Sequence, residues 1–381
     1  MSATTPDRGT ERASSERLAR RSGRELRLIQ STVQAVALVL VLAAYLVLPL
    51  VVSDLWANVF VLAGILAIGG LGLNLLTGFA GQASLGHAAF IAIGAFTGSY
   101  LGRSADFGGK GQPFLVYLVV AMIAGGLVGF VVGLPALRLR GPYLVIVTLG
   151  LVFATVYVLQ QWTTVSNGNA GAPAPVTLQI GSVDFKSFDL FGLRDTPLGK
   201  NQGMMYIVWA FVALTALVVK NIVRSRPGRA LQAIRDRDVA AEVVGISLFR
   251  YKVGAFVASS AIAAGAGAFY CHYLGYVKPD PLQFGLALSV TFLAVMIVGG
   301  IGTVYGTMIG AVIIGALPVL VHEYGTNLPL VDAQTVGAFS DIVVAAVLVL
   351  TLLTQPSGIA GTLHKLGGGR SRAKPAPEPA T

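Results

Sequence analysis

The sequence predicts an all-α polytopic membrane protein of about ten transmembrane helices, with one broken helix and a short helix in a long loop. Hydrophobic residues make up 55% of its 381 residues and charged residues only 12%, roughly half the charged share of a soluble domain. Its mean hydropathy is +0.75. Apolar runs of about 20 residues, long enough to cross the hydrocarbon of a bilayer, recur along most of the chain.

Ten apolar segments are expected to cross the membrane and together form a domain over residues 33–356. The first follows an Arg-rich tail, 1–32, which we expect to be disordered, and it is too long for the apolar region of a signal peptide. A low-complexity tail, 357–381, is also expected to be disordered. The expected spans are 33–52, 56–77, 84–101, 113–137, 143–162, 203–223, 252–277, 284–301, 304–321 and 338–354.

Basic residues predict the orientation of these spans. Of the 27 Lys and Arg, 21 fall on one side of the membrane if the N-terminus is cytoplasmic, as the positive-inside rule requires. Both termini and the loop 224–252 are therefore predicted to be cytoplasmic, and the loop 163–202 extracellular, in a multi-pass protein of the plasma (inner) membrane. Because the basic residues cluster at span ends, the net charge of +10 predicts no nucleic-acid partner.

Ionisable residues separate three classes of function. The 17 Asp and Glu fall in tails, loops or span ends, whereas ion-coupled carriers usually bury such a group in the translocation path. A secondary transporter, which is driven by an ion gradient, is therefore less favoured than a transporter that receives its energy from elsewhere, but it stays an alternative. The four His are scattered and predict no catalytic or metal site, and the sequence has no phosphate-binding Gly-x-x-x-x-Gly-Lys-Ser/Thr loop. We expect His272 to lie at the membrane interface.

The stretch "GLNLLTGFAGQASLGHAAF", residues 72–90, predicts a broken helix. Two full crossings take about 40 residues, which leaves roughly six of the segment 56–101 for "GFAGQA". A helix that restarts at Ser84 would offer free N–H groups and a positive dipole end to a carboxylate or carbonyl. Alternatively, Ser84 only caps the helix while Gln82 and His87 bond neighbouring helices. The expected substrate-path residues are Asn74, Phe79, Gly81, Gln82, Ser84, His87 and Phe90.

The loop 224–252 is expected to carry a helix over 229–244, ended by Gly245. Leu231, Ile234 and Val243 would form its apolar stripe. Such a helix either lies in the membrane interface or docks into a soluble protein, and its mixed charge favours docking. The residues proposed for this contact are Arg229, Arg235, Arg237, Asp238, Glu242 and Gly245.

Three motifs carry a resemblance to a known family. "ALQAIRDRDVAAEVVGISLFRYKVGAF" resembles the cytoplasmic coupling segment of ABC importer permeases. "NLLTGFAGQASLGHAAFIAIGAF" is similar to the signature of branched-chain amino acid permeases of the LivM type, and "GGIGTVYGTMIGA" to their late Gly-rich motif. The resemblance covers roughly residues 56–356. It departs at "TTVSNGNAGAPAP", 163–175, where the family often has a Thr-Gly-Gly-rich stretch.

The resemblance implies a permease subunit that forms half of a translocation path for leucine, isoleucine and valine and performs no enzymatic step. A second homologous permease would complete the path, and two cytoplasmic ATPase subunits would dock on the coupling helix. These partners would bind ATP and Mg, so no cofactor is expected in this chain. An extracellular solute-binding protein would deliver the substrate. Because similar permeases carry urea or short amides, such a substrate is the alternative.

Overall fold

The computed structural model describes residues 45–103, 112–136, 142–175, 179–180, 183–184, 200–325, 336–354 and 358–361. The predicted tail 1–32 lies outside the described residues, as does the tail 357–381 except for 358–361. The chain divides into two compact units, Met1–Val51 and Val52–Thr381. The described part of the first unit, residues 45–51, is helical.

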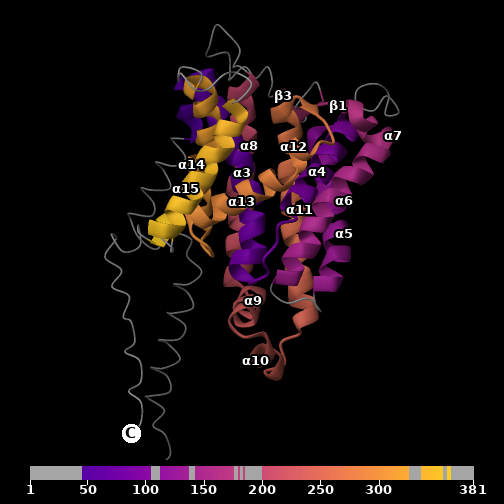
Figure 1. Cartoon of the computed structure of the whole chain (residues 1–381), viewed down its shortest axis with the longest axis vertical. Helices are drawn as coiled ribbons and strands as arrows, with labels where there is room; N and C mark the ends of the chain where they lie inside the picture. The colour runs from indigo at the N-terminus through magenta and orange to yellow at the C-terminus, as the bar shows by residue number, and fades with distance from the viewer. Residues whose placement is uncertain are drawn as a thin grey trace, which may run out of the picture. The chain divides into compact units, whose positions relative to one another are not determined.

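The second unit is built from apolar helices (Figure 1). Its long helices are α3 (Asp54–Leu73), α4 (His87–Arg103), α5 (Phe114–Ala136), α6 (Pro142–Gln161), α8 (Lys200–Arg224), α11 (Leu248–Leu274), α13 (Leu286–Gly299), α14 (Val304–Gly325) and α15 (Val336–Thr354). Its short ones are the π-helical η1 (Asn74–Phe79), α7 (Thr163–Ser166), the 3-10 helix η3 (Gly168–Ala170), α9 (Arg226–Asp236), α10 (Asp238–Val243) and α12 (Pro281–Phe284).

The predicted class, an all-α polytopic membrane protein, is confirmed. Within the described residues, 7 helical segments are long and apolar enough to cross a membrane. Helix α4, with 17 residues, is just too short to be counted, and the apolar part of α15 spans only Ile342–Thr351. Most of the predicted span 33–52 lies outside the described residues. The number of ten spans therefore stays a prediction.

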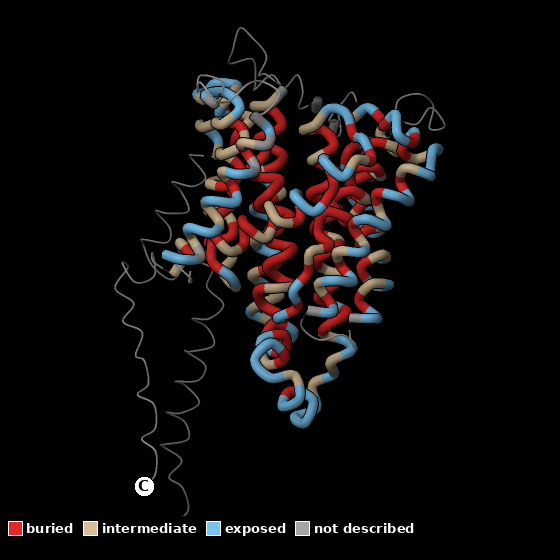
Figure 2. Tube along the Cα trace, viewed as in Figure 1, coloured by how far each residue is buried: buried red, intermediate tan, exposed pale blue. Residues whose placement is uncertain are grey.

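Helix α3 lies at the centre of the bundle, and 15 of its 20 residues are buried (Figure 2). It packs against α8, α11, α13 and α14, while α11 also packs against α4 and α5. A helix that is apolar on every face needs such surroundings. In contrast, α5, α6 and α8 expose many apolar side chains, as expected of helices that face lipid or another membrane subunit.

Small residues bring α4, α5 and α11 close together. A Cβ atom added at Gly94 of α4 would lie 1.9 Å from the Ala264 carbonyl oxygen of α11, and one at Gly267 would lie 2.1 Å from the Ile91 oxygen. A Cβ at Gly125 of α5 would lie 2.4 Å from the Ala264 Cβ. These backbones are therefore in direct contact, which only small residues permit.

The two loops predicted to lie on opposite sides of the membrane are found at opposite ends of the bundle. Helices α9 and α10 extend from one end, while α7 and the strands β1 and β3 lie at the other (Figure 1). Strand β1 (Ala172–Pro173) pairs antiparallel with β4 (Tyr276–Val277). Strand β2 (Gln179–Ile180) pairs antiparallel with β3 (Val183–Asp184).

The prediction of a single helix over 229–244 is wrong. The chain forms α9 and α10, separated at Arg237, whose φ of −155° and ψ of 104° are extended. The second helix begins at Asp238, whose Oδ1 accepts a hydrogen bond from the Val239 N–H at 2.9 Å. The predicted apolar stripe ends with Leu231 and Ile234, which are buried, while Val243 is exposed.

Candidate translocation and coupling site

The predicted break follows a π-helical end of α3. The Ala80 N–H donates to the Leu75 oxygen at 3.2 Å and the Gln82 N–H to the Leu76 oxygen at 3.1 Å. Both bonds span more residues than the four of an α-helix, so the last turn is widened. Residues 80–86 are not helical, and Gly81 has a φ of +70°, a conformation that glycine adopts at little cost.

Asn74 ties this π turn to the turn before α14. Its Nδ2 donates to the Thr303 carbonyl oxygen at 3.0 Å and to the Thr307 Oγ1 at 2.8 Å. Its Oδ1 accepts from the Gly302 N–H at 2.8 Å. Asn74 is fully buried. Its three hydrogen bonds, which we call the Asn74 fork, join two segments more than 200 residues apart in the sequence.

The other predicted substrate-path residues that have side chains are also buried within the helix bundle. His87 places Nε2 2.7 Å from the Gly69 oxygen, and its ring meets the edge of Phe292. The Gln82 Nε2 donates to the Lys252 carbonyl oxygen at 3.3 Å, while the Gln82 Oε1 is buried without a hydrogen-bond partner. The side chains that share this burial are Phe79, Gln82, Ser84, His87 and Phe90.

The helix after the break was predicted to restart at Ser84. This prediction is wrong, because the helix begins at His87. The Ser84 Oγ accepts a hydrogen bond from the Gly86 N–H at 3.2 Å, and neighbouring helices supply further hydroxyl groups. The Leu85 N–H donates to the Thr148 Oγ1 of α6 and the Ala88 N–H to the Ser289 Oγ of α13, both at 3.1 Å. These amides are therefore already paired within the chain. Thr148 and Ser289 were not predicted to act here, and their place inside apolar spans was the only signal that the sequence offered.

Arg235 of α9 reaches the break from the adjoining loop. Its Nη1 donates a hydrogen bond to the carbonyl oxygen of Gly78, in η1. A Cβ at Gly81 would lie 2.9 Å from the Arg235 Cγ and 3.2 Å from its Cα. The two predicted groups of residues, those of the break and those of the loop 224–252, are therefore in contact.

The remaining predicted loop residues lie around α10. Asp238 places Oδ2 3.7 Å from the Nζ of Lys252, and Gly245 follows α10 with a φ of +86°. Arg229, Arg237 and Glu242 are exposed. The same segment also exposes apolar side chains, which the sequence did not indicate. We call this surface the α10 tip; it is formed by Val239, Val243, Val244 and Phe249.

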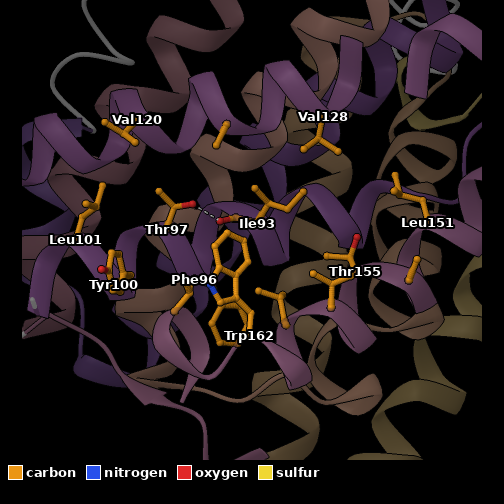
Figure 3. A pocket seen from close by; sticks show the side chains of 15 residues that line it. Ile93, Phe96, Thr97, Tyr100, Leu101, Val120, Val128, Leu151, Thr155 and Trp162 are labelled. Carbon is orange, nitrogen blue, oxygen red and sulfur yellow. Dashed lines mark hydrogen bonds between the residues drawn. The ribbon is translucent and has the colours of Figure 1, made fainter. Parts of the chain in front are cut away.

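A cavity of about 540 Å³ lies between α4, α5, α6 and α7, apart from the break (Figure 3). Among its lining residues are Phe96, Thr97, Tyr100, Thr155 and Trp162, and none is charged. The Thr97 hydroxyl donates to the Ile93 oxygen at 2.7 Å. Burying the two charges of an amino acid here would be costly, so the cavity suits an apolar occupant.

His272 is buried at the end of α11, and its predicted place at the membrane interface stays a prediction. It is hydrogen-bonded to the hydroxyl of Tyr117, and the Phe114 ring lies beside it. Aromatic packing from α5 thus encloses the imidazole. Within the described residues, no group of His, Cys, Asp or Glu could hold a metal ion.

A bundle of helices long and apolar enough to cross a membrane makes the chain a multi-pass membrane protein, and a buried break between two of them is typical of transport proteins. Over residues 55–352 the chain matches the family model described as "Branched-chain amino acid transport system / permease component". The chain belongs to this family of permeases.

Individual relatives agree with the family. The chain is 30% identical over 338 residues to the high-affinity branched-chain amino acid transport system permease protein LivM of Escherichia coli (strain K12), covering 86% of this chain and 75% of the relative. It is 25% identical to LivH, of the same transport system by name, from Salmonella typhimurium, covering 76% and 89%. The fructose import permease protein FrcC of Rhizobium meliloti is 27% identical, covering 57% and 58%. No solved structure matches the chain.

Proposed function

We propose that the chain is one permease subunit of an ABC importer for branched-chain amino acids. The substrate class is supported by the similarity to LivM over most of the chain. The additional similarity to LivH supports a second, homologous permease as the partner that completes the translocation path. This chain performs no chemistry in the proposal, and partner ATPase subunits bind and hydrolyse ATP.

The proposed orientation places α9 and α10 in the cytoplasm. This orientation is supported by the positive-inside rule, because with the predicted spans 21 of the 27 Lys and Arg, and both termini, would lie on that side. The opposite end, with α7, β1 and β4, then faces outward, and there an extracellular solute-binding protein delivers the substrate.

The α10 tip carries the proposal of a cytoplasmic partner. Val239, Val243, Val244 and Phe249 are 59%, 85%, 80% and 50% exposed. Outside a membrane, clustered apolar side chains on a short helix are typical of a surface that docks in a groove of another protein. The charged Arg237 and Glu242 lie on the same segment and would supply the polar rim of that contact.

Val243→Asp tests this contact, with Leu282→Asp as the matched control. Leu282 is 88% exposed and lies in α12, beyond the far end of α11, so it should not touch an ATPase. Burying a valine contributes about 1.5–3 kcal/mol, so its loss weakens binding roughly 10- to 100-fold.

The measurement is the amount of ATPase subunit retained when the permease is purified from membranes. Val243→Asp should lose it while Leu282→Asp keeps it. Equal retention by both variants would contradict docking at the α10 tip.

We further propose that the break lines the substrate path, at the residues named from the sequence. The buried, unpaired Oε1 of Gln82 supports this, because a buried acceptor without a donor can accept a bond from the ammonium group of a passing amino acid. Gln82→Ala should lower the rate of leucine uptake while the ATPase subunits stay bound. Unchanged uptake would count against a path at this position.

A further inference from the structure

The end of η1 is capped only in part by its own chain. The N–H groups of Ala80 and Gln82 donate to the Leu75 and Leu76 oxygens. Beyond Phe79 the backbone is not helical, so later carbonyl groups such as that of Gly78 have no further helical N–H to bond. These carbonyls also carry the negative end of the helix dipole. The oxygen of Gly78 accepts a hydrogen bond from the guanidinium group of Arg235, in α9.

Two glycine turns contact the Arg235 side chain, although the residue as a whole is exposed. At Gly81, a Cβ would lie 2.9 Å from the Arg235 Cγ. At Gly302, in the turn before α14, a Cβ would lie 3.3 Å from the Arg235 Nη1. Both glycines have positive φ values, +70° and +76°. We call Arg235, Gly78, Gly81 and Gly302 the Arg235 junction.

The junction connects three segments that are far apart in the sequence. Arg235 and Gly78 are 157 positions apart. Asn74, one turn before Gly78, bonds the N–H of Gly302 and thereby holds the third segment. A displacement of α9 would therefore act on the end of η1 and on the turn before α14 together.

We propose that Arg235 is a positioning residue that caps the first half of the broken helix and transmits movement of α9 to it. Its predicted role was contact with an ATPase; the junction assigns its guanidinium group an intramolecular partner instead. This inference rests on the proposed function, because only docking of an ATPase on the α9–α10 segment would move α9 during transport.

The first arm of the test needs no ATPase. Hydrogen exchange is measured on the purified full-length permease in lipid nanodiscs for wild type, Arg235→Ala, Arg235→Lys and Arg229→Ala. Arg229 is the control, because it is an exposed arginine of the same helix that bonds only the nearby Arg224 oxygen. The reporters are the amides of Ala80 and Gln82, which donate to η1.

Loss of one charge-assisted hydrogen bond should speed exchange at these amides about tenfold in Arg235→Ala. Arg235→Lys keeps the charge and should lie between Arg235→Ala and wild type, and it replaces the alanine variant if that variant does not fold. Arg229→Ala should match wild type. Exchange in Arg235→Ala and Arg235→Lys equal to that of wild type would overturn the cap.

The second arm uses the complex with its ATPase subunits and measures leucine transported per ATP hydrolysed. Arg235→Ala should retain the ATPase subunits as wild type does but transport several-fold less leucine per ATP. Loss of those subunits from Arg235→Ala, with retention by Arg229→Ala, would make Arg235 a docking residue and overturn the inference. If wild type itself binds no ATPase, the proposed function fails, while the exchange measurement still decides the cap.

Discussion

Replacing Asn74 with alanine should destabilise the permease by about 2–6 kcal/mol. The Gly302 N–H loses its acceptor, at 2.8 Å, and an unsatisfied amide that is at least partly shielded from water costs about 1–3 kcal/mol. Thr303 and Thr307 lose less, because the Thr307 Oγ1 still donates to the Thr303 oxygen at 2.8 Å. Each of their two lost bonds to Asn74 contributes about 0.5–1.5 kcal/mol.

The assay is an SDS titration of the purified permease, followed by tryptophan fluorescence. Asn221→Ala is the control: Asn221 is exposed near the end of α8, and its replacement should change the free energy of unfolding by no more than about 0.5 kcal/mol. If Asn74→Ala unfolds within that same margin of wild type, the fork between η1 and the turn before α14 contributes nothing, and the reasoning is refuted.

Three further predictions concern packing, backbone conformation and topology. Gly94→Val should abolish folded, membrane-inserted protein, because its Cβ would collide with the α11 backbone, whereas Gly254→Ala, with no atom within 4 Å of its Cβ, should accumulate normally. Gly245→Ala should lower the free energy of unfolding by about 1 kcal/mol, through the φ of +86° alone; an unchanged value would contradict this. In intact cells, an impermeant thiol reagent should label Leu282→Cys but not Val243→Cys, and the reverse would invert the proposed orientation.

Hydropathy predicted most of the helices because the length of an apolar run reports directly on the bilayer it must cross. The predicted span 56–77 corresponds to α3 and η1, and the span 252–277 to α11. The span that was predicted from Ser84 begins later, at His87. Its local amides are bonded by hydroxyl groups of α6 and α13, which no local pattern places near it.

The sequence predicted the two segments of the site, the break and the loop helix, but not the contacts between them. Glycine and polar residues inside an apolar stretch indicated the break, and mixed charge indicated the loop helix. That Arg235 meets Gly78 depends on how α9 packs against η1, over a separation of 157 positions. The division between α9 and α10 was likewise missed, because Arg237 is neither glycine nor proline, and Asp238 starts a new helix where it also meets Lys252.

The proposal that this chain belongs to an ATP-driven importer is tested most directly by measuring the energy source of leucine uptake. The whole complex is reconstituted in proteoliposomes without any ion gradient, with the ATPase subunits accessible from the outer medium. The solute-binding protein and leucine are enclosed on the opposite face. We predict leucine transport only when hydrolysable ATP is supplied on the face that carries α9 and α10. Transport that proceeds without ATP and follows an imposed proton or sodium gradient would contradict the proposal.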